Sequence, residues 1–166
     1  MKYFRAAAMT AALAFAVSCA GGNVRSGEGV EVGTGAGAVW GVAQDDGLKV
    51  FKGIPYAKPP KGDLRYAPPQ EPAPWKGTFH ATAFGPCCPQ LPDPGEAASG
   101  LRQDEDCLSL NIWTPGTDNR KRPVIVYLYG GAFNYGGAAD PLYDGSAFAK
   151  RGDVVFTTVN YPDTSA

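Results

Sequence analysis

Two apolar runs near the end of the sequence most constrain its fold. Residues 124–129 (VIVYLY) and 154–159 (VVFTTV) carry no charged side chain, which is typical of strands covered on both faces of a sheet. Between them, residues 143–152 (YDGSAFAKRG) provide enough chain for a short helix. Two buried strands joined by a helical crossover predict a parallel pair in an α/β sheet.

The upstream chain carries further strand signals and one long irregular stretch. Residues 38–42 and 48–54 are strand-like runs joined across Asp46-Gly47, a dipeptide that favours a hairpin turn. Residues 108–113 (LSLNIW) alternate apolar and polar side chains, which predicts a half-buried strand. Residues 55–77 are so dense in proline that we expect an irregular arm without a helix or a central strand.

Composition bounds the class of protein and excludes some functions. With 166 residues, of which 44% are hydrophobic, the chain can form one domain with its own core. A formal net charge of -1 provides no basic stripe for nucleic-acid phosphates, so we expect no nucleic-acid partner. His80 is the single histidine and has no zinc-like spacing to the cysteines, so we expect no metal site.

The first twenty residues have the pattern of an export signal. Lys2 and Arg5 accompany an apolar run at residues 6–17 that is too short to span a bilayer comfortably. Two forms of processing fit the sequence. Cleavage after Ala20 would release the protein into the periplasm or the medium, whereas lipidation of Cys19 at a lipobox-like site would tether it to the outer membrane.

We expect a flexible, glycine-rich linker at residues 21–37 and a folded domain at residues 38–166. Apart from the signal, the sequence contains no candidate transmembrane segment. The predicted organisation is therefore a signal, a linker and one domain.

Export also bears on the remaining cysteines. Cys87, Cys88 and Cys107 are an odd number of thiols for an oxidising compartment. One bridge, from either Cys87 or Cys88 to Cys107, leaves one thiol over. On the chain-entropy estimate such a bridge stabilises the fold by roughly 3 kcal/mol.

Five motifs, in this order, resemble the N-terminal part of the type B carboxylesterases, the cholinesterase-like branch of the α/β-hydrolase fold. They lie between residues 50 and 161 and cover most of this range: VFKGIPYAKPPKGDLRYAPPQEPAPWKG, FGPCCPQ, DEDCLSLNIWTP, PVIVYLYGGAFNYGG and YDGSAFAKRGDVVFTTVNY. The resemblance implies an antiparallel N-terminal region leading into a mostly parallel sheet, a small-molecule ester as substrate and no metal or organic cofactor.

The resemblance also implies a role for the glycines after the run at residues 124–129. In this family, a glycine-rich turn supplies backbone N–H groups that bind the oxyanion formed from an ester. The turn corresponds to Gly130, Gly131 and Ala132, and the N–H groups of Gly131 and Ala132 are the expected donors. Because alanine keeps its N–H, we expect its presence at position 132 to cost little.

Two further pairs follow from the resemblance alone. The family joins a cysteine in CPQ to the cysteine in EDCL, which selects Cys88 and Cys107 as the disulfide and leaves Cys87 as the extra thiol. Arg65 and Glu105 correspond to a salt bridge that pins the proline-rich arm to the domain. The alternative for this pair is two solvated surface charges.

Serine esterases of this kind need a nucleophile, a base and an orienting acid, and the sequence contains no Gly-x-Ser-x-Gly motif. Ser165 lacks both flanking glycines, Ser146 is better explained as a helix N-cap, and His80 lies far upstream of the family's base. We therefore expect an inactive, truncated N-terminal part of an exported esterase, with apolar faces exposed at residues 124–128 and 154–159. A non-catalytic adhesion or interaction module and a degraded pseudogene product are the alternatives.

Overall fold

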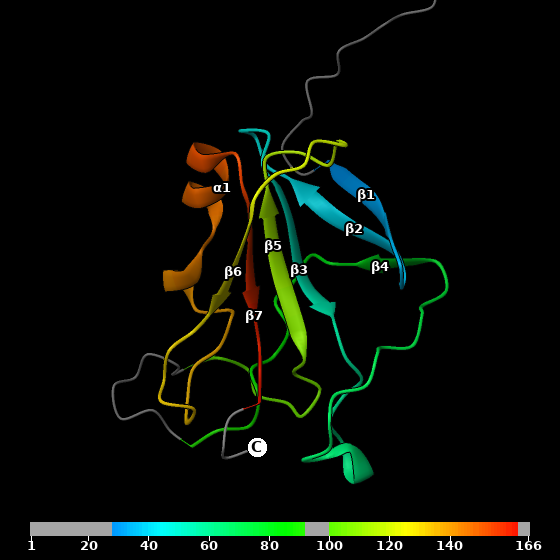
Figure 1. The fold of residues 1–166 in the computed structure, drawn as a ribbon, viewed down its shortest axis with the longest axis vertical. Coiled ribbons are helices and arrows are strands. Elements are labelled where there is room, and N and C mark those ends of the chain that lie inside the picture. Colours follow the sequence, from blue (N-terminus) through cyan, green and yellow to red (C-terminus); the bar gives the residue numbers. More distant parts are fainter. Residues whose placement is uncertain (1–27, 92–99, 163–166) are drawn as a thin grey trace, which may run out of the picture.

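The computed structural model of the chain describes residues 28–91 and 100–162. They form a seven-stranded mixed sheet of order β1-β2-β3-β5-β7-β6, with β4 paired to β2 (Figure 1). The expected signal at residues 1–20 lies outside the described residues. The elements are β1 (Gly29–Thr34), β2 (Gly37–Ala43), β3 (Lys49–Pro55), β4 (Thr78–His80), β5 (Ser109–Thr114), β6 (Val124–Leu128) and β7 (Val155–Val159), with α1 (Ser146–Gly152) and two 3-10 helices, η1 (Gly62–Leu64) and η2 (Pro141–Tyr143).

The predicted hairpin is confirmed. Strands β2 and β3 are antiparallel, with Val42 opposite Val50. The turn between them places Gly47 at a φ of 84°, a conformation that glycine adopts without steric cost. The Asp46 carboxylate accepts a hydrogen bond from the Leu48 N–H at 3.1 Å and holds the turn closed.

The linker predicted at residues 21–37 is wrong for its second half. Residues 29–34 form β1, which pairs antiparallel with β2 over its whole length. Val30 and Val32 alternate with polar and glycine residues and pack against the core around Val39. The many glycines masked this alternation in the sequence, while residues 21–27 lie outside the described part of the chain.

The predicted parallel pair is also confirmed. Strands β6 and β7 run parallel, with Val124 opposite Val155, and α1 lies in the connection between them (Figure 1). The helix N-cap is Gly145 rather than Ser146. Ser146 is the first helical residue, and its N–H donates to the Asp144 carboxylate at 2.9 Å.

The main core lies where α1 covers β5 and β7. Trp113 on β5 is 1% exposed and contacts Phe84 and Phe156, with ring centres 6.3 and 6.2 Å away. Ala149 is fully buried on α1, and its small side chain lets the helix approach the sheet. Each aromatic pair of this kind contributes about 0.5–1.5 kcal/mol beyond its buried area.

Strand β6 forms an edge of the sheet. We expected β6 to be covered on both faces, but the described residues leave most of its side chains exposed. Its apolar side chains are exposed, as expected for a sheet that ends here; Val124, Ile125, Val126 and Leu128 are 61%, 38%, 60% and 61% exposed. The exposed apolar face expected at residues 154–159 is wrong, because β7 lies between β5 and β6 and its central residues are buried. An uncovered apolar edge of this kind favours aggregation.

Candidate functional site

The candidate site is the segment of residues 130–138, here called the glycine loop, which follows the carboxyl end of β6 (Figure 1). Because β6 and β7 are parallel, the residues after each strand meet at one end of the sheet. Tyr129 and Tyr161 stack there with ring centres 4.4 Å apart. The Tyr161 hydroxyl donates to the Tyr129 carbonyl at 2.5 Å, and the Tyr129 hydroxyl donates to the Tyr161 carbonyl at 3.2 Å. This reciprocal pair fixes the start of the glycine loop.

Gly131 has a geometry that only glycine can adopt. Its φ is 142°, in the region that L side chains avoid. A Cβ built on Gly131 would lie 1.7 Å from the carbonyl oxygen of Tyr135. The Gly131 carbonyl in turn accepts a hydrogen bond from the Asn134 N–H at 2.9 Å. The loop therefore folds back on Gly131, and a side chain at this position would force it open.

The N–H groups of Gly131 and Ala132 donate no hydrogen bond to any of the residues that the structure describes. Gly131 is half-buried and Ala132 is exposed. Two consecutive N–H groups that no described residue accepts, on a turn at the end of a sheet, can bind an anionic oxygen. The structure thus keeps both predicted donors available.

We expected an alanine at position 132 to cost little free energy, but the backbone conformation of Ala132 does not fit this expectation. Its φ is 54° and that of Phe133 is 60°, so two non-glycine residues adopt the left-handed conformation in succession. This conformation costs an L residue about 1–2 kcal/mol relative to its preferred backbone. Alanine keeps the N–H donor, as expected, but it does so at a conformational cost that glycine would avoid.

The end of the glycine loop is held by buried polar side chains of β5, of β7 and of the residue after β7. The Ala138 N–H donates to the Asn160 side chain at 2.8 Å, and the Ala138 carbonyl accepts from Asn111 at 3.2 Å and from Thr158 at 3.1 Å. Asn111, Thr158 and Asn160 are each 1% exposed. Since all three side chains lie in the core, the loop is anchored to the sheet at Ala138.

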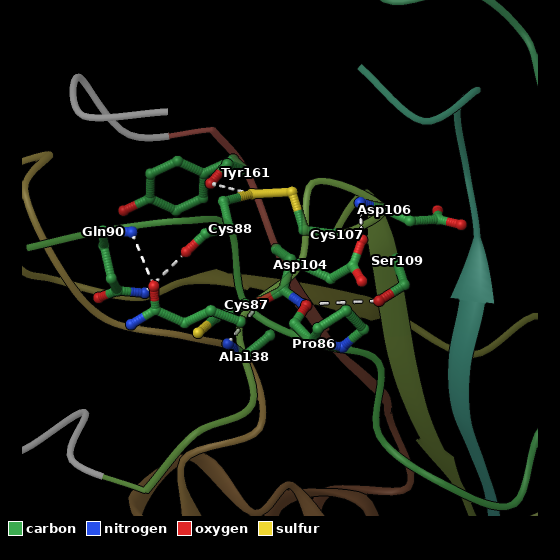
Figure 2. Close-up of a disulfide and its surroundings, with 12 residues drawn as sticks. Pro86, Cys87, Cys88, Gln90, Asp104, Asp106, Cys107, Ser109, Ala138 and Tyr161 are labelled. Atoms are coloured by element: carbon green, nitrogen blue, oxygen red, sulfur yellow. Dashed lines mark hydrogen bonds between the residues drawn. A yellow bond between two sulfur atoms is a disulfide. The ribbon is translucent and has the colours of Figure 1, made fainter. Parts of the chain in front are cut away.

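The predicted disulfide is confirmed, and Figure 2 shows it next to Tyr161. Cys88 and Cys107 are bonded, and both are buried in a small apolar cluster with Ala57 and Leu108. Cys87 is outside the disulfide, and its buried thiol donates to the Arg102 carbonyl at 3.5 Å. The disulfide therefore joins the segment before Gln90 to the segment just before β5.

Arg65 and Glu105 form an ion pair between the proline-rich arm and the segment before β5. A second bridge joins Lys61 to Asp104 at 3.0 Å. The Asp106 N–H and the Lys61 ammonium hold the pKa of Asp104 below its usual range. Both pairs are largely exposed, so each contributes little on its own. They fix the position of the arm rather than take part in chemistry.

The other residues weighed as catalytic candidates lie away from the glycine loop. His80 is on β4, at the opposite side of the sheet from β6, and its ring packs 5.4 Å from that of Trp40. Ser146 begins α1, and Ser165 lies outside the described residues. No group of three or more acidic, cysteine or histidine side chains that could hold a metal occurs in the part of the chain with described coordinates. Within that same part, no helix is long and apolar enough to cross a membrane.

Comparison with known proteins identifies the family of the chain. The profile of the carboxylesterase family matches residues 28–162. The chain belongs to the carboxylesterase family. Para-nitrobenzyl esterase of Bacillus subtilis is 44% identical over 119 residues, which cover 70% of this chain and 24% of that protein. Fumonisin B1 esterase of Sphingopyxis macrogoltabida is 45% identical over 129 residues, which cover 77% of this chain and 23% of that protein.

Solved carboxylesterase structures share the fold. A para-nitrobenzyl esterase superimposes with a TM-score of 0.75 at 44% identity, covering 80% of this chain and 28% of that one. A carboxylesterase of Geobacillus stearothermophilus gives a TM-score of 0.71 at 45% identity, covering 81% and 27%. The predicted family and the α/β-hydrolase fold class are confirmed, and the chain corresponds to the N-terminal part of the family. It spans about a quarter of the length of the curated relatives that it matches.

Proposed function

We propose that the glycine loop forms part of the oxyanion hole of an exported serine carboxylesterase. The observation that carries this proposal is the pair of N–H groups on Gly131 and Ala132, which donate to no described residue. A carboxylesterase needs such donors where the carbonyl oxygen of its substrate becomes negative. An adhesion module of the same fold has no use for them, so the catalytic function is the better supported.

The chemistry follows from the position of the two donors. A serine hydroxyl attacks the carbonyl carbon of a small-molecule carboxylic ester and transfers its proton to a histidine. Negative charge then develops on the carbonyl oxygen, and the N–H groups of Gly131 and Ala132 bind it. Removing one donor of this type typically lowers kcat by 10²–10³. The tetrahedral intermediate then expels the alcohol, which takes the proton from the histidine, and leaves the acyl group bonded to the serine. Water attacks this acyl group with the histidine as base, so that the carboxylic acid leaves and the serine hydroxyl is restored.

The nucleophile, base and acid of this reaction are not supplied by the 166 residues. The sequence contains no Gly-x-Ser-x-Gly motif, and His80 is its single histidine. We therefore propose that these residues supply the oxyanion donors and the first strands of the sheet, which the disulfide stabilises. We also propose that these residues by themselves do not hydrolyse esters. No metal or organic cofactor is needed for this chemistry.

The proposed location is outside the cytoplasm. The signal-like sequence pattern at residues 1–20 and the disulfide between Cys88 and Cys107 support this location, because cytosolic thiols are kept reduced. Lipidation of Cys19 would add a membrane tether, and cleavage after Ala20 would leave the protein in the periplasm or the medium.

A chimera tests the proposal. Residues 28–162 replace the matching segment of the Bacillus subtilis para-nitrobenzyl esterase, and hydrolysis of a para-nitrobenzyl ester is followed. We expect the chimera to be active and Gly131→Ala to lower kcat at least about 100-fold, because the added Cβ displaces the loop. Gly33→Ala is the matched control, since a Cβ at Gly33 meets nothing within 4 Å. An unaltered kcat in a folded Gly131→Ala chimera would refute the proposal.

A further inference from the structure

The Gln90 side chain binds the glycine loop at Gly136. Its side-chain oxygen accepts a hydrogen bond from the Gly136 N–H at 2.6 Å, and its side-chain nitrogen donates to the Gly136 carbonyl at 2.8 Å. The same nitrogen donates to the Cys88 carbonyl at 3.2 Å. One amide side chain thus satisfies both backbone groups of Gly136, although the two residues are 46 positions apart.

The contact with Gly136 reaches Gly131 through a single peptide unit. The Tyr135 carbonyl and the Gly136 N–H belong to the same peptide group, and no described peptide bond is cis. In a planar trans peptide, the C=O and the N–H point in opposite directions. When Gln90 holds the Gly136 N–H, the Tyr135 oxygen points the other way. That oxygen lies where a Cβ of Gly131 would be, 1.7 Å from the ideal position.

Gln90 is itself held on a rigid support. Its backbone N–H donates to the Gln103 side chain at 3.0 Å. Cys87 is bound to the same neighbouring segment, because its N–H donates to the carbonyl of Arg102, the residue before Gln103, at 2.9 Å. The disulfide at Cys88 lies two residues before Gln90 (Figure 2). The amide of Gln90 therefore approaches the loop from a segment that is fixed independently of the loop.

We propose that Gln90 is a positioning residue for the oxyanion donors. It acts through Gly136 and the Tyr135 carbonyl on Gly131, and it does not touch the substrate. This inference rests on the proposed function of the glycine loop. Asn160 also holds the loop, but it is 1% exposed, so replacing it would disturb the core. Gln90 is half-buried and can be replaced while the sheet stays intact.

Amide hydrogen exchange on the full 166-residue chain tests the positioning without any activity. In Gln90→Ala we expect the Gly136 N–H to exchange about tenfold faster, because its acceptor is lost. We also expect the N–H resonances of Gly131 and Ala132 to shift. Gln70→Ala is the matched control, since exposed Gln70 bonds Lys58 in the proline-rich arm. Equal Gly136 exchange in Gln90→Ala and the unaltered chain would overturn the inference.

The chimera described above gives the kinetic test. We expect Gln90→Ala to lower kcat roughly tenfold with KM unchanged within about twofold, since a displaced donor weakens transition-state binding. Gln90→Glu keeps an acceptor for the Gly136 N–H, but its second carboxylate oxygen would face the carbonyl oxygens of Gly136 and Cys88, so a loss of kcat at least as large as in Gln90→Ala is expected. It also serves as the test variant if Gln90→Ala does not fold. Gln70→Ala should change neither constant.

The outcomes separate this inference from the proposed function. If Gly131→Ala abolishes activity while the Gln90 variants keep full kcat, the loop is catalytic and the positioning role of Gln90 is refuted. If Gly131→Ala and Gln90→Ala both leave kcat unchanged, the oxyanion function itself falls. A loss of kcat in both, with faster Gly136 exchange in Gln90→Ala, supports both.

Discussion

Removal of the disulfide between Cys88 and Cys107 should lower the free energy of unfolding by about 3 kcal/mol. The two residues are 19 positions apart. Closing a loop of this length removes roughly 11 cal/mol/K of entropy from the unfolded chain, or about 3 kcal/mol at 25 °C. Both sulfur atoms also pack in an apolar cluster with Ala57 and Leu108. Lost packing should therefore add to the entropic effect.

The assay needs a background without Cys87, because its thiol is adjacent to Cys88 and could form a new bridge to Cys107. We would compare Cys87→Ala with the triple variant in which Cys88 and Cys107 are also alanine. Urea unfolding is followed by tryptophan fluorescence, to which Trp113 contributes because it is 1% exposed when folded. With a slope of about 2 kcal/mol/M, the triple variant should unfold at roughly 1.5 M less urea.

Reduction provides the control. Dithiothreitol should lower the midpoint of Cys87→Ala and leave that of the triple variant unchanged. A difference below about 1 kcal/mol between the two oxidised variants would contradict the reasoning. It would mean that residues 88–107 are already restricted in the unfolded chain, so that the cross-link removes little entropy.

Three other changes probe the sheet and its charges. Trp113→Ala should cost about 3–5 kcal/mol in urea unfolding, because it leaves a cavity between α1 and the sheet; a cost below about 1 kcal/mol would show that this core is not packed. Val126→Lys should slow aggregation in light scattering and change the unfolding free energy by less than about 0.5 kcal/mol, because Val126 is 60% exposed on an edge strand; faster aggregation would contradict this. Arg122 lowers the pKa of Asp118 to about 2, so its stabilisation is present above about pH 4 and is lost as the pH falls toward 2. Asp118→Asn should flatten that part of the pH dependence of urea unfolding, and an unchanged pH profile would contradict the assignment.

The parts of the fold that the sequence predicts are those with local signals. The β6–β7 pair follows from two uncharged runs and the stretch between them, and the β2–β3 hairpin follows from Asp46-Gly47. Strand β1 was hidden because its glycines resemble a linker, although Val30 and Val32 alternate as in a strand. Burial also depends on neighbouring strands. The uncharged run at residues 124–128 therefore predicts a strand without showing that it forms an edge.

The site is also predictable only in part, because local sequence signals do not show which distant segments meet in the fold. The family's motifs locate Gly131 and Ala132, but they do not show that Ala132 has a φ of 54°. Gln90 and Asn160 contact the glycine loop from segments far away in the sequence. No local pattern marks such contacts, since each depends on which segments the folded sheet brings together. Gln90 belongs to the CPQ motif, but in the sequence this motif serves only to identify the disulfide cysteine Cys88.

The most direct measurement is the crystal structure of the chimera with a phosphonate bonded to the catalytic serine supplied by the para-nitrobenzyl esterase. The phosphoryl oxygen occupies the place of the oxyanion. If the account is right, it lies about 2.7–3.1 Å from the backbone nitrogens of both Gly131 and Ala132. An oxygen that points away from both nitrogens, while the glycine loop keeps its present conformation, would show that these N–H groups do not form the oxyanion hole.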